Sequence, residues 1–421
     1  MTTPNPKLEI ALARFTAQPG ARPDQAAHVR IAVTADSRLL QQFNQQAQAG
    51  HLRGFVLQAA NHTTPNLTGT YDIHSGVVTL PAMSFLPVGR SASADLSATL
   101  QIQQMSVAFA YSTYQDAARN PHAVTQDMVD NLQSTFNGSP VLADQIKRAT
   151  TMIDPDDGRA LLEGFGFVGP GVAAGGTYDG GNKVMNLPPL GLQNNTTATP
   201  LGRFNAQDMT FVLGHEIQHS FNHAAKTQAT ADFLRDIDRQ ARVNGPAHDY
   251  TDELRAYIQA GREDEAKAQI AGWNALLSRE RQSRPSDHGL DLMARLSNSR
   301  VGDFVSVDPA TSLVTQKPGL AFNPDGSLSP TPANIAAMGQ HYFDRPSQPY
   351  ALPNQRPMRL GEHKDLAGNL QPTADYPNYY GTWAVEQIVR AEDRSNVSHQ
   401  GAPPRMTIDM TGLGLKEDLI E

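Results

Sequence analysis

The sequence contains no cysteine, and this absence excludes disulfide bonds, thiolate metal sites and cysteine nucleophiles. Any bound metal ion must therefore be held by histidine and carboxylate side chains. Basic residues are also in the minority, since 34 Lys and Arg stand against 42 Asp and Glu. A net charge of -8 offers no basic footprint for phosphate backbones or anionic lipids. We expect neither nucleic acid nor a membrane among the partners.

Long hydrophobic runs are absent as well. No stretch approaches the roughly 18 apolar residues of a membrane span, and residues 1–13 lack a basic segment followed by an apolar one. We therefore expect synthesis in the cytoplasm without a cleaved signal peptide, and any export by another route. With 421 residues, 33 Gly and 29 Pro, the chain is long enough for one large domain or two packed domains, and it is rich in loops.

An internal repeat pairs residues 69–81 with residues 176–188, matching at Gly, Thr, Tyr, Asp, Val, Leu and Pro. Before each copy, a Gly-Phe pair at Gly54 or Gly164 opens an apolar segment. A turn rich in Gly, Asn or Ser, followed by an alternating strand that ends at Pro, predicts a β-hairpin in both copies. The two segments thus read as related pieces of the fold.

Helical patterns follow each copy, over about residues 94–118 and 206–242. Further helices are predicted at residues 252–281, 333–342 and 380–394. Residues 318–376 are dense in Pro, Asn, Gly and Ser and read as long loops that wrap the rest of the protein.

The second of these helices contains His215-Glu216-Ile-Gln-His219, an HExxH motif. Residues four apart lie on one face of a helix, so His215 and His219 can direct both imidazoles at one zinc ion. Glu216 lies about 100° around the helix from His215 and can serve as the general base for an attacking water. Asn205, with Asp208 three residues later, predicts the helix start.

The third metal ligand has several candidates. The metzincin pattern requires a glycine and a histidine at the positions of Asn222 and Ala225, so that class is excluded. His223 lies about 12 Å along the helix axis from His215, too far to share one ion with it. Glu263 and Glu265 in the next predicted helix remain. Glu265 is favoured, because the small residues Ala266 and Ala268 beside it would let two helices approach closely.

These features resemble the glutamate-ligand zinc peptidases (gluzincins), and more narrowly the metallopeptidase effector domains that some bacteria attach to type VI secretion spike proteins. The matching segments occur in the expected order from about residue 164 onward. They are GTYD at residues 176–179 with Leu187-Pro188, HEIQH at residues 215–219, DEAKAQIAGWNA at residues 264–275, YPNYYG at residues 376–381 and IDMTGLGL at residues 408–415. No spike domain is present, and the first hairpin copy has no counterpart in this pattern.

The resemblance implies an α+β, zincin-like fold that is mostly helical, with a small sheet and a loop-rich C-terminal region. It implies one zinc ion with Glu265 as its third ligand, and a hairpin edge strand that borders the cleft. It further implies a secreted antibacterial toxin that cleaves peptide bonds, delivered most readily to the periplasm of a target cell. An immunity protein and a secretion-system carrier would then be partners besides the peptide or protein substrate.

Within this frame, residues 1–150 form an N-terminal helical and hairpin region and residues 151–421 the zinc metallopeptidase domain. A peptidase also needs a donor for the developing oxyanion, and the candidates are Tyr379, Tyr380, His341 and His363. Two alternatives remain open. One is a zinc amidase that acts on peptidoglycan stem peptides, and the other is a non-catalytic binding module with the same fold.

Overall fold

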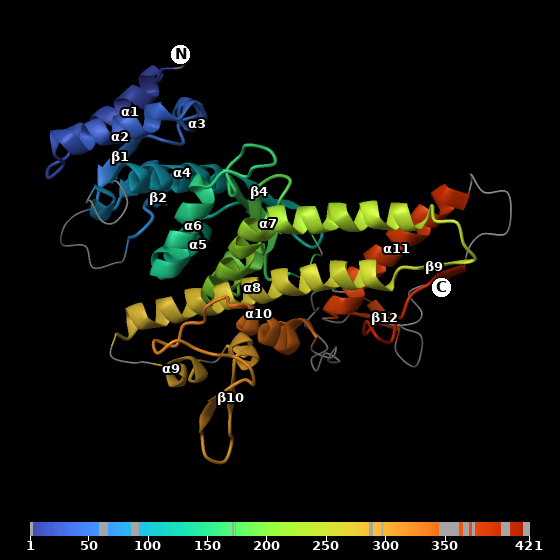
Figure 1. The fold of residues 1–421 in the computed structure, drawn as a ribbon. Helices are drawn as coiled ribbons and strands as arrows, with labels where there is room; N and C mark the ends of the chain where they lie inside the picture. The colour runs from blue at the N-terminus through green and yellow to red at the C-terminus, as the bar shows by residue number, and fades with distance from the viewer. Residues whose placement is uncertain are drawn as a thin grey trace. The chain divides into compact units, whose positions relative to one another are not determined.

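The computed structural model describes residues 3–58, 66–85, 92–170, 172, 174–285, 289–296, 298–344, 362–364, 370–372, 375–396 and 405–415. The described part is mixed α+β, mostly helical with several small sheets, so the predicted fold class is confirmed at that level (Figure 1). None of the described helices combines the length and the apolar character that crossing a membrane requires.

The chain forms two compact units. The first unit comprises residues 1–221 and 271–293, and the second comprises residues 222–270 and 294–421. Two long helices, α7 (Ala206–Gln240) and α8 (Thr251–Ser283), each contribute one part to each unit. Residue 150, at which the sequence analysis divides the chain, lies inside the first unit, in the helix Pro140–Thr151.

The first unit is built on one continuous apolar core to which most of its helices and both of its three-stranded sheets contribute. Its elements before α7 are α1 (Pro6–Ala17), α2 (Pro23–Ala35), α3 (Ser37–Gln48), β1 (Gly54–Leu57), β2 (Thr70–Asp72), β3 (Val77–Leu80), η1 (Ala82–Phe85), α4 (Ala92–Ala110), β4 (Thr113–Gln115), β5 (Pro121–Ala123), α5 (Gln126–Asn137), α6 (Pro140–Thr151), β6 (Gly164–Phe167), β7 (Thr177–Asp179), β8 (Val184–Leu187) and η2 (Pro189–Leu192).

Both repeat copies form the same three-stranded sheet, in the orders β1-β3-β2 and β6-β8-β7. The two hairpins, β2 with β3 and β7 with β8, are antiparallel as predicted. The Gly-Phe strand of each copy pairs in parallel with the last strand of its hairpin. Each sheet is followed by a 3₁₀ turn and a long helix. The repeat is therefore a structural duplication.

Equivalent hydrogen bonds support this conclusion. The hydroxyl of Tyr71 donates to the carbonyl of His51, and the hydroxyl of Tyr178 donates to the carbonyl of Leu161. Likewise the amide of Arg53 donates to Gly76, as the amide of Glu163 does to Lys183. These partners occupy matching positions before the first strand and in the hairpin turn of the two copies.

The helix after the first copy is shorter than predicted. It ends at Ala110 instead of continuing to residue 118, because residues 113–123 form the small antiparallel hairpin of β4 and β5. The turn of this hairpin is closed by Asp116, whose carboxylate accepts hydrogen bonds from the backbone and side chain of Asn120. Local turn chemistry thus ends the helical pattern.

The second unit has its own core, formed where α7 and α8 continue and α11 packs against them. Its central residues are Phe233, Ile237, Tyr250, Leu254, Ala384, Val385 and Ile388. Besides the long helices, the elements from residue 247 onward are β9 (Ala247–Asp249), α9 (Leu290–Ala294), η3 (Ser299–Asp303), β10 (Val305–Val307), β11 (Val314–Gln316), α10 (Pro332–Met338), η4 (Gly339–Phe343), β12 (Glu362–Lys364), β13 (Leu370–Pro372), α11 (Tyr376–Asn396) and β14 (Arg405–Thr407).

Candidate metal centre

Helix α7 begins where the sequence predicts. The side chain of Asn205 accepts hydrogen bonds from the amides of Gln207 at 2.9 Å and Asp208 at 3.1 Å, which satisfies two of the amides left open at a helix start. From Ala206 the helix runs without proline to Gln240. This regular backbone is what brings His215 and His219 onto one face.

The two imidazoles converge on one point. The Nε2 atoms of His215 and His219 lie 3.2 Å apart, and the rings meet edge to face at an angle of 79°. Two atoms that each lie about 2.1 Å from a zinc ion in tetrahedral geometry are about 3.4 Å apart. The observed separation therefore fits a pair of ligands to one ion. His215 is buried and His219 half-buried.

Glu265 completes a group of three. The ligand atoms of His215, His219 and Glu265 all lie within 4.8 Å of one another. Two imidazoles and one carboxylate form a donor set found at catalytic zinc sites, which use three protein ligands and keep a fourth position open. The residue types and their spacing thus fit a zinc ion.

The other candidates for the third ligand lie elsewhere. The carboxylate of Glu263 accepts a hydrogen bond from Gln259 at 3.1 Å and faces Lys267 at 3.8 Å, with 46% of its side chain exposed. It is part of a solvated helix face. His223 is half-buried and does not belong to the three-residue group.

Close packing brings α7 and α8 together on both sides of the two histidines. In the first unit, a Cβ added to Gly214 would lie 2.7 Å from the Cβ of Ala275 and 3.1 Å from the carbonyl oxygen of Ala271. In the second unit, the side-chain amide of Asn222 donates to Asp264 at 2.9 Å. Within each unit, the contact fixes how α7 and α8 lie against each other at that point.

Glu216 lies beside an edge strand. Strand β7 forms one edge of its sheet, and Gly176 immediately precedes it. A Cβ on Gly176 would lie 3.1 Å from Cγ of Glu216 and 3.0 Å from Cγ1 of Val212. Only a residue without a side chain lets the strand approach the helix this closely.

The duplicated copy shows what this arrangement looks like without ligands. Gly69, the counterpart of Gly176, faces Gln103 of α4 in the same way, with an added Cβ 2.8 Å from its Cγ. Gln103 thus stands where Glu216 stands, and Ile102 and Ser106 then correspond to His215 and His219.

The edge of that first sheet is also covered. Gln133 of α5 accepts a hydrogen bond from the amide of Tyr71 and donates to its carbonyl at 3.0 Å. Asn137 accepts from the amides of Leu67 and Thr68. Side-chain amides therefore pair with the strand edge as a neighbouring strand would. The first copy therefore lacks the two candidate histidines, and the β2 edge of its sheet is covered.

Tyr380 of α11 adjoins the group of three. Its hydroxyl donates to Oε1 of Glu265 at 3.2 Å and accepts from Nζ of Lys226 at 3.1 Å. Burial raises the pKa of Tyr380 well above its ordinary value, and the charge of Glu265 raises it further. The phenol therefore stays protonated and remains a donor at neutral pH.

The remaining oxyanion candidates differ in their surroundings. Tyr379 is 47% exposed, and Nε2 of His341 faces the carbonyl of Pro318 at 2.8 Å. The side chain of His363 lies outside the described residues. Among the three candidates with described side chains, Tyr380 is the one that contacts a member of the group.

Two residues next to the group of three were not predicted as site residues from the sequence. Lys226 and Asp264 form an ion pair at 2.9 Å next to Glu265, and Asp264 is 4% exposed. A signal for Lys226 was present, because it lies seven residues after His219 and thus on the same helical face. For Asp264 the only local hint was its place beside Glu265.

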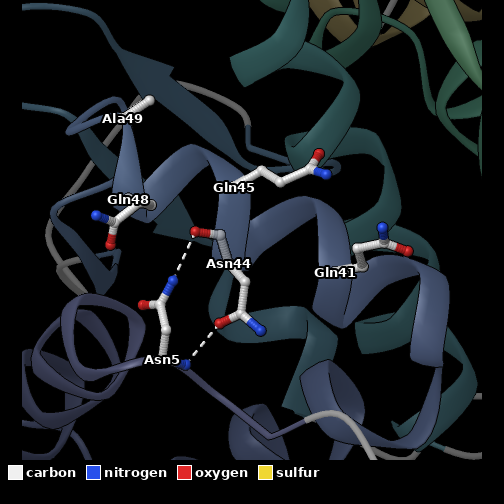
Figure 2. A pocket seen from close by; sticks show the side chains of 6 residues that line it. All are labelled: Asn5, Gln41, Asn44, Gln45, Gln48 and Ala49. Atoms are coloured by element: carbon white, nitrogen blue, oxygen red, sulfur yellow. Dashed lines mark hydrogen bonds between the residues drawn. The ribbon is translucent and has the colours of Figure 1, made fainter.

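A separate hollow of about 590 Å³ lies on the first unit near α3 (Figure 2). Asn5 and Asn44 face each other there, with the amide of Asn5 donating to Oδ1 of Asn44 at 2.7 Å. Its lining carries no ionisable group and no member of the three-residue group, so it supplies no acid, base or charged ligand. The lining residues are Asn5, Gln41, Asn44, Gln45, Gln48 and Ala49.

No family model, no curated protein and no solved structure matches this chain. The candidate centre therefore rests on its own residues. These are two imidazoles one helical turn apart, a carboxylate from the next helix, and Glu216 beside the start of an edge strand.

Proposed function

We propose that the protein is a zinc-dependent metallopeptidase in which His215, His219 and Glu265 hold the zinc ion and Glu216 is the general base. The observation that carries the proposal is the convergence of these three ligand atoms within 4.8 Å, two of them from α7, which also carries Glu216, and one from α8. If the two histidines were ordinary surface residues of a structural helix, the buried carboxylate of Glu265 would not be needed beside them.

The chain's own residues would act in a defined order. A zinc ion in this site supplies a Lewis acid for the scissile carbonyl and lowers the pKa of a water that it binds. Glu216 accepts a proton from the attacking water as the new C–O bond forms. The protonated side chain of Glu216 then donates this proton to the leaving nitrogen as the C–N bond breaks. The products are a carboxylic acid and an amine.

An extended peptide is the substrate that the surroundings of Glu216 favour. An edge strand can pair with a substrate backbone and hold its scissile carbonyl in place. Strand β7 is such an edge, and Gly176 before it contacts Glu216. This placement supports a peptidase over an enzyme with a closed pocket for a short stem peptide.

The biological setting that we propose follows from the resemblance of the quoted segments to secreted effector peptidases. The protein would be made in the cytoplasm, carried by a secretion system and delivered to the periplasm of a competing bacterium. A producing cell would then need an immunity protein against its own toxin.

The test compares wild-type protein with Glu216→Gln and His219→Ala. Elemental analysis measures bound zinc, and a quenched fluorescent casein measures hydrolysis. We expect Glu216→Gln to keep the zinc and lose about 10²–10⁴-fold in rate, since the ligands stay and the base is gone. His219→Ala should lose both. His223→Ala, a change on the same helix outside the group, is the matched control and should keep both.

Wild-type protein without zinc, or Glu216→Gln with undiminished hydrolysis, would contradict the proposal. The biological setting is tested by expressing wild type and Glu216→Gln in the cytoplasm and, separately, in the periplasm of a test bacterium. If only wild type is toxic in the periplasm, the result supports an effector. If wild type and Glu216→Gln are equally toxic, catalysis is excluded as the cause. Digestion of purified sacculi with no cleavage of casein would identify the amidase instead.

A further inference from the structure

We propose that Tyr380, Lys226 and Asp264 form a hydrogen-bonded chain that positions Glu265 as a metal ligand. This inference rests on the proposed function and adds positioning residues to it. The hydrogen-bonded chain joins three helices of the second unit, because Lys226 lies in α7, Asp264 and Glu265 lie in α8, and Tyr380 lies in α11.

The contacts are consecutive. The ammonium group of Lys226 lies 2.9 Å from Oδ2 of Asp264 and 3.1 Å from the hydroxyl of Tyr380. That hydroxyl lies 3.2 Å from Oε1 of Glu265. Asn222 adds a bond to the other oxygen of Asp264 at 2.9 Å, so this carboxylate is held from two sides.

The donor and acceptor roles in this chain have one consistent assignment. Lysine can only donate, and an ionised carboxylate can only accept. The hydroxyl of Tyr380 must therefore accept from Lys226, and its own proton must point toward Glu265. Asp264 anchors the ammonium group that fixes this direction. The chain thus controls how the Glu265 carboxylate is turned, which decides whether an oxygen faces the two imidazoles.

The position of the Tyr380 ring is also fixed. A Cβ added to Gly261 of α8 would lie 2.8–3.0 Å from three of its ring atoms, so the ring lies directly on the helix backbone. The ring centroids of Phe343 and Tyr257 lie 5.6 Å and 6.1 Å from the ring centroid of Tyr380. The ring is therefore held independently of its hydroxyl, and removal of the hydroxyl alone should leave the packing intact.

Residues that hold a metal ligand in place commonly change metal affinity by 10–100-fold when they are removed. We therefore expect Tyr380→Phe to weaken zinc binding by about that factor, measured by competition with a chromophoric chelator. The visible spectrum of the cobalt-loaded protein should change too, because it reports the geometry of the ligands. Tyr379→Phe is the matched control, since it removes the same hydroxyl from an exposed neighbour on α11, and it should alter neither measurement.

Gly261→Ala provides a second variant. It displaces the ring while keeping the hydroxyl, and we expect it to weaken zinc binding as well. Unfolding of each metal-free variant monitors the fold, and unchanged midpoints for Tyr380→Phe and Tyr379→Phe separate positioning from loss of structure.

The outcomes distinguish this inference from the proposed function. Wild-type protein that binds no zinc overturns both. Wild-type protein that binds zinc, together with Tyr380→Phe that binds it equally well and gives the same cobalt spectrum, overturns the positioning chain and leaves the proposed function standing. A loss of affinity in Tyr380→Phe that Tyr379→Phe does not share supports the chain.

Discussion

Gly214, the residue before His215, is the position at which a single methyl group should test how the candidate centre is held together. In Gly214→Ala the new Cβ would lie 2.7 Å from the Cβ of Ala275, 3.1 Å from the carbonyl oxygen of Ala271 and 3.2 Å from Cα of Gly272. Favourable contacts between carbon atoms occur at about 3.5–4.0 Å. Two of the three neighbours are backbone atoms and the third has no rotamer to adopt, so the helices themselves must separate.

Two opposing effects decide the magnitude. Replacing glycine by alanine inside a helix contributes about 1 kcal/mol of stability. Overpacking a well-filled interface costs about 1–3 kcal/mol. Because none of the three neighbours can move aside alone, we expect the cost to lie in the upper part of that range. The free energy of unfolding should therefore fall by about 1–2 kcal/mol.

The assay is urea unfolding of the metal-free protein followed by circular dichroism, together with zinc affinity measured by chelator competition. Zinc affinity should also fall, since His215 follows the displaced residue and a functional site tolerates only about 0.5 Å of displacement. Ala275→Gly removes the nearest atom, so the double variant should recover part of the loss, and the two changes should couple by about 0.5–3 kcal/mol. A Gly214→Ala variant that is more stable than wild type by about 1 kcal/mol would refute the reasoning, because helix propensity alone would then account for it.

Local patterns were sufficient to predict the long helices and the placement of the HExxH residues on one helix face. The helix predicted over residues 252–281 spans Thr251–Ser283, and the one predicted over residues 206–242 spans Ala206–Gln240. Both are set by interactions within a few residues, such as the Asn205 cap and the apolar periodicity. Both hairpins were predictable for the same reason, because their turns are local.

Pairings between distant residues were not predictable in this way. Nothing in the Gly-Phe segments indicates that each pairs in parallel with the last strand of its hairpin, across an intervening loop and strand. Such pairing depends on how the sheet packs on helices, and α1 lies against β1 while α4 lies against β6. The equivalence of Gln103 and Glu216 likewise appears only when the two glycines before the strands are compared in space.

The choice between Glu263 and Glu265 illustrates a signal that the sequence carried but that the structure was needed to interpret. Gly272 packs against Phe211 of α7, with an added Cβ 2.8 Å from its ring. Glu265 lies seven residues before Gly272, almost two full turns, so both share one face of α8. Glu263 is rotated by about 200° from Glu265 and belongs to the opposite face. The glycine that permits close approach therefore marks the carboxylate that faces α7.

The remaining predictions concern the metal, two buried polar pairs and one exposed turn. Removal of zinc with EDTA should lower the thermal unfolding midpoint of wild type but not of His215→Ala, because a ligand that binds only the folded state stabilises it; equal shifts would contradict the site. His248→Ala should cost about 1–3 kcal/mol in urea unfolding, because the buried carboxylate of Glu392 loses a hydrogen-bond partner 2.6 Å away and keeps only Tyr250 of these two; an unchanged midpoint would contradict the expectation. Lys183→Gly has two opposing effects, because it relieves a strained backbone conformation and removes a buried ion pair. Lys183 has a φ of 59° where the first copy has Gly76 at 66°, so glycine should relieve about 1–2 kcal/mol of strain. Its ammonium group, however, pairs with Asp154, which is 1% exposed, and losing that partner costs about 3–5 kcal/mol. We therefore expect Lys183→Gly to be less stable than wild type by about 2–3 kcal/mol, while Arg119→Gly, at a φ of 66° in an exposed turn, should gain stability. If both variants were stabilised in urea unfolding, strain would outweigh the buried pair and the reasoning would be wrong.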